Sequence, residues 1–271
     1  MSSPYETWLT EFEEPAIDQG RFAEYHARML DSMPSERGVT VRELNIPPIP
    51  ADAASVGERS TFLTRTYVHL FAAIMAFVAV EYVFFATGVA EAILDLVLRT
   101  NWLIILFGFI VVASVASSMA HRSLSRPLQY SALGIYVVAE ALIFAPILLL
   151  ADTSYPGAIT AAAFATLVGF TVLTAIVFVT RKDFSFMRAA LVWIGLGALA
   201  AIVASVIFGF ELGTLFSIAM IVFAGAVILY NTSNVLHHFP TDRYVAAALE
   251  LFAAVALMFW YVLRLFMGSR R

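Results

Sequence analysis

The fold is decided by residues 244–266, which read YVAAALELFAAVALMFWYVLRLF. This stretch is apolar on nearly every side, and a helix that is hydrophobic all round is buried in lipid, in protein or in both. It nevertheless carries Glu250 and Arg264, which are about four helical turns apart and therefore share one face. An ionisable side chain at membrane depth faces the interior of a helix bundle or a watery cavity. We therefore expect this helix at the centre of a bundle.

The composition extends this reading to most of the chain. The 271 residues are 61% hydrophobic and 13% charged, whereas soluble domains are about a quarter charged. A helix needs roughly 20 apolar residues to span a bilayer. The stretches that qualify are 66–88, 102–120, 128–150, 157–180, 187–209, 212–230 and 244–266. We predict an all-α polytopic membrane protein with seven transmembrane helices.

The first sixty residues differ from the rest. They hold 11 of the 20 acidic residues but only 5 of the 16 basic ones, and 46–50 form a proline-rich linker. We therefore divide the chain into an acidic arm with two short amphipathic helices, residues 1–60, and a seven-helix domain, residues 61–271. The arm either covers its own protein or docks on a partner. Its candidate partner-binding residues share a helical spacing of apolar side chains: Trp8, Leu9, Phe12, Phe22, Tyr25 and Met29.

The loops predict the orientation. Lysine and arginine accumulate in cytoplasmic loops, and here they follow the second, fourth and sixth spans. The basic residues in these turns are Arg122, Arg126, Arg181, Lys182, Arg188 and Arg243. We expect a bacterial inner membrane as the location, with the N-terminus in the cytoplasm. Seven crossings would put the end of the chain outside, which Arg264, Arg270 and Arg271 oppose. The alternative is a seventh helix that enters the membrane without fully crossing it.

Several classes of function lack their sequence signals. The chain has no cysteine, which removes disulfides and cysteine-based metal or redox chemistry. It has no His-Glu-x-x-His, no Gly-x-Ser-x-Gly and no phosphate loop, and no basic footprint for nucleic acid. Ser114, Ser117 and Ser118 have His121 on their own helix, but small serines at helix contacts are the favoured account. We expect no enzyme, no cofactor and no metal site.

Three short motifs carry a family resemblance. Residues 61–70 (TFLTRTYVHL), 229–233 (LYNTS) and 242–249 (DRYVAAAL) resemble the transmembrane Bax inhibitor motif family. The resemblance covers roughly residues 60 to 267. It implies a fold in which two three-helix layers wrap a central seventh helix. It also implies calcium-leak or stress-regulatory roles and, in some bacteria, contact with a membrane-bound AAA protease.

One departure from this family concerns its pH sensor. Members with a pH-controlled calcium leak carry two facing aspartates, and the resemblance places these at Asn231 and Ala254 of this sequence. Two close carboxylates share a proton and sense pH, whereas asparagine and alanine cannot titrate. We therefore expect any ion flux to lack the usual switch at this pair.

Other polar groups lie at membrane depth. The candidates for an ion path or sensor are Glu250, Asn231, Glu140, Glu81 and Arg243. Arg243 shares a helix face with Glu250, but about 10 Å of helix axis separates them. Glu250 is therefore expected to need a partner from another helix, for which Asn231, Tyr136 and Thr174 are the candidates. The alternative is a purely structural set of helix-to-helix hydrogen bonds.

Two functions follow from these observations. The first is a cation leak or ion sensor, for calcium or protons, that uses the membrane glutamates. The second is a non-conducting accessory subunit whose arm, residues 1 to about 45, binds a membrane protein partner such as a protease complex. Cation flux that survives deletion of the arm would favour the first.

Overall fold

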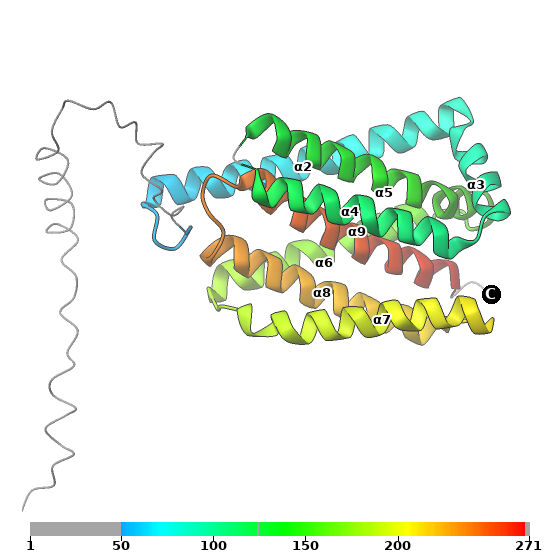
Figure 1. Ribbon diagram of the computed structural model, residues 1–271. Coiled ribbons are helices and arrows are strands. Elements are labelled where there is room, and N and C mark those ends of the chain that lie inside the picture. The colour runs from blue at the N-terminus through cyan, green and yellow to red at the C-terminus, as the bar shows by residue number, and fades with distance from the viewer. Residues whose placement is uncertain (1–49, 124, 269–271) are drawn as a thin grey trace, which may run out of the picture. The chain divides into compact units, whose positions relative to one another are not determined.

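The protein is helical throughout the residues that the computed structural model describes, 50–123 and 125–268 (Figure 1). The predicted arm helices and the partner-binding candidates Trp8 to Met29 lie outside these residues. The helices are α2 (Val56–Thr87), α3 (Val89–Arg99), α4 (Trp102–Arg122), α5 (Arg126–Ser154), α6 (Ala158–Thr180), the short 3-10 helix η1 (Ser185–Met187), α7 (Arg188–Phe208), α8 (Gly213–His237) and α9 (Tyr244–Gly268).

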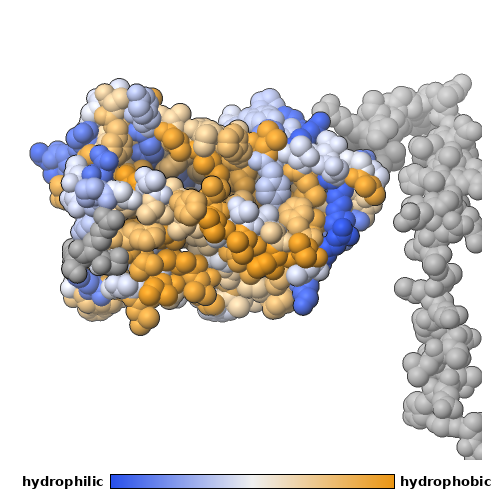
Figure 2. Space-filling view, turned by 180° about the vertical axis from the view of Figure 1, so that it is seen from behind, coloured by the Kyte–Doolittle hydropathy of each residue, from blue (hydrophilic) through white to orange (hydrophobic). Residues whose placement is uncertain are grey.

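Seven of these helices are long and apolar enough to cross a membrane, which confirms the predicted fold class. Their apolar side chains form a belt with hydrophilic residues at both ends (Figure 2). α3 is the additional, shorter helix. It continues from α2 through Gly88, whose φ of 77° lies in the left-handed region that an L side chain rarely adopts.

α2 begins well before its apolar stretch, because a capping box rather than hydropathy sets its start. The oxygen of the Ser55 side chain accepts a hydrogen bond from the backbone N–H of Glu58 at 3.4 Å, and the Glu58 carboxylate accepts one from the backbone N–H of Ser55 at 3.1 Å. This capping box starts α2 at Val56. The predicted boundary at residue 60 therefore falls inside a helix.

α9 is the most enclosed of the seven spans. Two thirds of its most apolar window, 67%, is buried, against 61% for α5 and at most 28% for the other five. It contacts α2, α4, α5, α6 and α8, and it runs between the group containing α2, α4 and α5 and the group containing α6 and α8 (Figure 1). The predicted central position is thereby confirmed. The wrapping by two three-helix layers stays a prediction, because α7 packs chiefly on α8.

The residues just before α2 are fixed to the turn between α8 and α9. The backbone N–H of Ala51 donates to the carbonyl of Phe239 at 3.0 Å, and that of Asp52 donates to the carbonyl of His237 at 3.3 Å. Ala51 is fully buried there.

Candidate functional site

A cavity of about 1390 Å³ follows one face of α9. It is lined along α9 from Leu249 to Gly268, which corresponds to about 28 Å of helix axis. The hydrocarbon core of a bilayer is about 30 Å thick, so the cavity extends over most of the depth that the helix crosses. α4 and α5 line one side of it, and α7 and α8 line the other.

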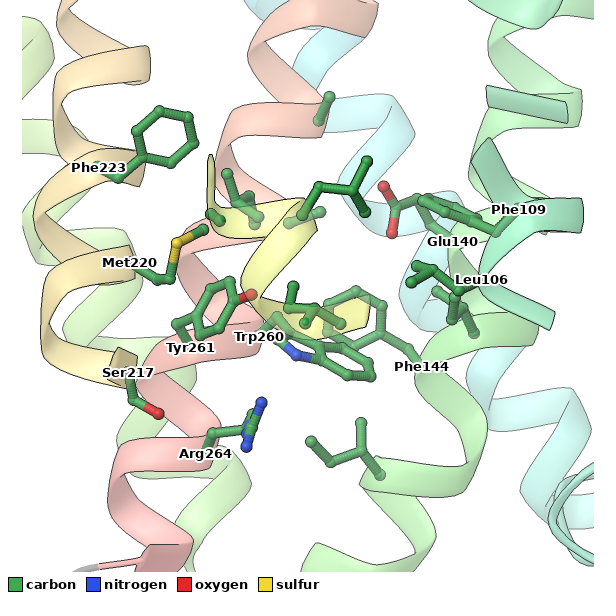
Figure 3. Close-up of a pocket in the computed structure, with 18 of the residues that line it drawn as sticks. Leu106, Phe109, Glu140, Phe144, Ser217, Met220, Phe223, Trp260, Tyr261 and Arg264 are labelled. Carbon is green, nitrogen blue, oxygen red and sulfur yellow. The ribbon is translucent and has the colours of Figure 1, made fainter. Parts of the chain in front are cut away.

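The middle of the cavity is apolar except for isolated charges. Glu140 of α5 and Arg264 of α9 point into the same space as the aromatic rings of Phe144, Trp260 and Tyr261 (Figure 3). The rings of Phe144 and Trp260 meet edge to face, with centroids 5.0 Å apart. An apolar stretch lined by aromatic rings resists the entry of water and ions.

One end of the cavity holds a part-buried acid–base pair. The Nε2 atom of His121, at the end of α4, lies 2.7 Å from Oε1 of Glu250 on α9. Oε2 of Glu250 is buried without a hydrogen-bond partner among the described residues, and Glu250 itself lines the cavity. The pair therefore joins α4 to α9 at the end of the cavity, and the second carboxylate oxygen of Glu250 has no partner among the described residues.

The hydrogen bonds of the ring fix how many protons the pair holds. Nδ1 of His121 lies 2.8 Å from the carbonyl oxygen of Ser117, which can only accept, so Nδ1 carries a hydrogen. The contact between Nε2 and Oε1 then contains one further proton, held either by an imidazolium or by a protonated carboxyl. Removing it would set the Nε2 lone pair against a carboxylate at 2.7 Å, which is repulsive.

Arg243 and Asn231 hold the two halves of this pair in place. A guanidinium N–H of Arg243 donates to the backbone carbonyl of His121, and the Arg243 side chain is only 12% exposed. The side-chain amide of Asn231 donates to the backbone carbonyl of Glu250 at 3.0 Å. Because both contacts use backbone oxygens, they position the pair without consuming its titratable atoms.

The structure brings together most of the residues predicted from the sequence. Glu250, Asn231 and Glu140 line the one cavity, and Arg243 reaches Glu250 through His121. Glu81 is separate from them: it does not line this cavity, and both of its carboxylate oxygens are buried without a partner among the described residues.

The predicted partner of Glu250 was wrong. Asn231 bonds its backbone rather than its side chain, Tyr136 interacts with Glu140, and Thr174 lies near Tyr67 and Thr232. The actual partner is His121, at the end of α4. A usable signal existed, since His121 ends the second span and lies among the basic turns at the same membrane end as Glu250.

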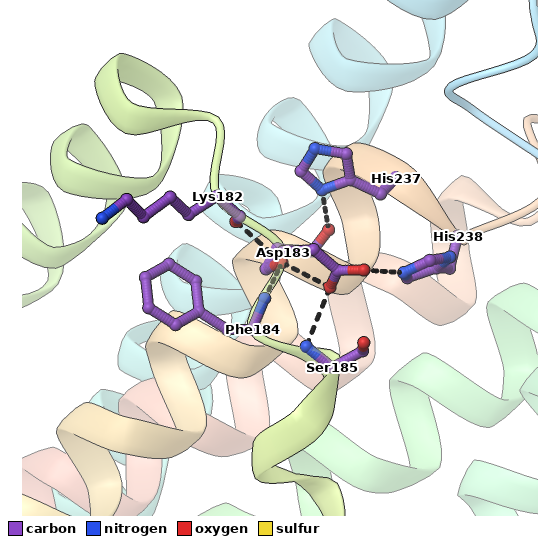
Figure 4. A network of polar contacts seen from close by, with 7 residues as sticks. Lys182, Asp183, Phe184, Ser185, His237 and His238 are labelled. Atoms are coloured by element: carbon purple, nitrogen blue, oxygen red, sulfur yellow. Dashed lines mark hydrogen bonds and ion pairs between the residues drawn. The ribbon is translucent and has the colours of Figure 1, made fainter. Parts of the chain in front are cut away.

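A second polar network lies outside the membrane spans, at the turn before α7 (Figure 4). Oδ1 of Asp183 accepts a hydrogen bond from the backbone N–H of Ser185 at 2.8 Å, and Oδ2 lies 2.9 Å from Nε2 of His238. These contacts, the one from Ser185 first, lower the pKa of Asp183 to about 2. Ser233 of α8 joins the network by accepting from the backbone N–H of Phe184. The network ties the start of α7 to the end of α8.

The fold and the site define a polytopic helical membrane protein whose central helix presents an acidic side chain to a long cavity between the helices. Comparison with models of known families gives a match over residues 59–271 to the family described as Inhibitor of apoptosis-promoting Bax1. The chain therefore belongs to this Bax inhibitor family, as its motifs predicted. Residues 1–58 lie outside the match. No curated protein matches the chain.

Proposed function

We propose that this protein is a cation leak whose route follows the cavity along α9, with the His121–Glu250 pair controlling one end. The observation that carries the proposal is the position of that pair. Its free carboxylate oxygen lies at the end of a cavity that follows the central helix for most of the bilayer depth. An ionisable pair within a transmembrane bundle is typical of ion and proton pathways.

The cavity chemistry favours a proton over calcium. A proton needs one titratable group at each step, whereas Ca²⁺ takes about six to eight oxygen ligands. Glu250 and Glu140 are single carboxylates on different helices: α9 has no second acid, and the second acid of α5, Asp152, does not line the cavity. Spaced single groups suit a relay in which water carries the proton between them.

The pair also supplies a direction for the pH response. With its shared proton, the pair links α4 to α9 and keeps the end of the cavity closed. Loss of that proton at higher pH makes the contact repulsive and frees Glu250 toward the cavity. We therefore expect flux to rise as the pH on this side rises. In this proposal the His121–Glu250 pair takes the role of the family's two aspartates. By resemblance, those aspartates correspond to Asn231 and Ala254 of this chain.

The test is proton and calcium flux in liposomes that contain the purified chain, recorded with an enclosed pH dye or calcium dye. We expect proton flux that increases from pH 6 to pH 8 on the His121 side and that persists when residues 1–49 are deleted. Absence of flux in oriented, folded protein would contradict the leak.

The second candidate is the accessory subunit, in which the arm binds a membrane protein partner. The observation that favours it is the attachment of residues 50–52 to the α8–α9 turn, because a partner pulling on the arm would act directly beside Phe239, whose ring contacts that of His121. A chain that shows no flux, but binds a membrane protease complex only when residues 1–49 are present, would support this candidate.

A further inference from the structure

A cluster of aromatic and basic side chains surrounds Tyr244 at the start of α9. The guanidinium carbon of Arg126, on α5, lies 4.6 Å from the centroid of the Tyr244 ring, and that of Arg65, on α2, lies 5.5 Å from it. Both distances are within the range of a cation–π interaction. The two guanidinium carbons therefore lie at most about 10 Å from each other.

The side chains of His69, Tyr130 and Tyr244 form a continuous chain of hydrogen bonds beside this ring. Nδ1 of His69 lies 2.7 Å from the carbonyl of Arg65 and must donate to it, so Nε2 is the acceptor in a neutral ring. The hydroxyl of Tyr130 then donates to Nε2 at 3.0 Å, and the hydroxyl of Tyr244 donates to Tyr130 at 3.2 Å. This chain fixes the Tyr244 ring and leaves the two guanidinium groups as the uncommitted donors of the cluster.

The cluster has an excess of positive charge. Among the described residues neither Arg65 nor Arg126 forms an ion pair, and the charged groups that act on the Tyr130 hydroxyl are these two arginines. Two neighbouring guanidinium groups repel each other unless an anion lies between them. A phosphate diester fits this arrangement, because its oxygens accept paired N–H bonds from arginine.

The position of the cluster identifies the source of the phosphate. Arg126 and Tyr244 are the first residues of α5 and α9, and Arg65 directly precedes the predicted entry of the first span at residue 66. All three therefore lie at the boundary between polar and apolar surface, where lipid headgroups are found. One turn further along α2, Val68 is 58% exposed and can contact an acyl chain.

We propose that Arg65, Arg126 and the Tyr244 ring bind the phosphate diester of one anionic phospholipid at this end of the bundle. The single negative charge of the bound phosphate diester offsets the repulsion between the two cations and joins α2 to α5 over the start of α9. The site is independent of ion conduction, since none of its residues lines the cavity along α9.

The test uses the full chain in detergent, titrated with phosphatidylglycerol and, separately, with phosphatidylcholine, with bound lipids counted by native mass spectrometry. We expect one tightly held phosphatidylglycerol. Arg65→Gln and Arg126→Gln should each weaken its binding by about tenfold, as expected for loss of a charge-assisted contact. Tyr244→Phe, which keeps the ring, should bind within about twofold of the wild type.

The matched control is Arg122→Gln. Arg122 is exposed at the end of α4 and contributes the same charge, but it makes no contact with Tyr244. It should leave binding within about twofold. Equal losses in Arg122→Gln and Arg126→Gln would mean general surface attraction and would overturn the site. So would equal binding of phosphatidylcholine, or displacement of phosphatidylglycerol by millimolar inorganic phosphate, which would indicate a site for the free ion.

Discussion

Replacing Glu250 by glutamine separates a conducting role of this side chain from a structural one. Glutamine keeps the shape, and its amide can still form a neutral hydrogen bond with Nε2 of His121, so the interaction is weakened rather than removed. A charge-assisted hydrogen bond contributes about 1.5–3 kcal/mol and a neutral one about 0.5–1.5 kcal/mol. Glu250→Gln should therefore lower the free energy of unfolding by only about 1 kcal/mol.

The effect on flux should be far larger than the effect on stability. Glutamine has no group that binds and releases a proton in this pH range, so a proton relay through position 250 is interrupted. We expect Glu250→Gln to fold, to retain the Asn231 bond to its backbone carbonyl, and to lose proton flux at every pH between 6 and 8. The measurements are thermal unfolding in detergent and the liposome dye assay on the same preparation.

Glu250→Leu is the comparison variant. It removes the partner of His121 altogether and leaves a part-buried ring nitrogen without a bond, at a cost of about 1–3 kcal/mol. A double-mutant cycle between positions 121 and 250 would give the coupling directly. Normal flux in folded Glu250→Gln would refute the route through this carboxylate and favour the accessory-subunit function.

Three further results are expected. Asn231→Asp combined with Ala254→Asp should add a titration step to the flux between about pH 5 and 8, by analogy with coupled carboxylates; an unchanged pH profile in the folded variant would count against the match of these positions to the family's aspartates. Phe144→Ala should raise the basal proton leak by removing one ring of the apolar stretch, at a stability cost of about 3–5 kcal/mol. The dye assay and thermal unfolding together check this. An unaltered leak would show that the Phe144 ring does not limit proton flux. Asp183→Asn should unfold slightly more easily than the wild type at pH 6, by less than about 1 kcal/mol because the carboxylate is part-exposed. Since the pKa of Asp183 is lowered to about 2, this difference should persist above about pH 4 and disappear as the pH falls toward 2; a difference that is constant from pH 6 to pH 2 would exclude the charge as its cause.

The helices could be predicted because the apolar pattern of each span indicates whether lipid or protein surrounds it. α9 is apolar on all sides while carrying Glu250, and that local pattern is enough to indicate a central, enclosed helix. The helix ends were less predictable, since hydropathy does not register the capping box at Ser55. Its two hydrogen bonds begin α2 before the apolar stretch does.

The pairing of His121 with Glu250 could not be derived from spacing. The two residues are 129 positions apart, and their contact depends on how deeply α4 and α9 sit relative to each other. That depth is set by packing across the whole length of both helices. The sequence identified which side chains were costly to bury, and only the packing identified which of them meet.

The central helix is also the last of the seven to be synthesised, and this has a consequence for biogenesis. Until α9 leaves the ribosome, His121 and Asn231 have no partner on it, and the helices that it separates have no common core. Six inserted spans must therefore wait in the membrane as an incomplete assembly, exposed to quality-control proteases. A premature stop before residue 244 would remove only about a tenth of the 271 residues and yet leave a product without its centre.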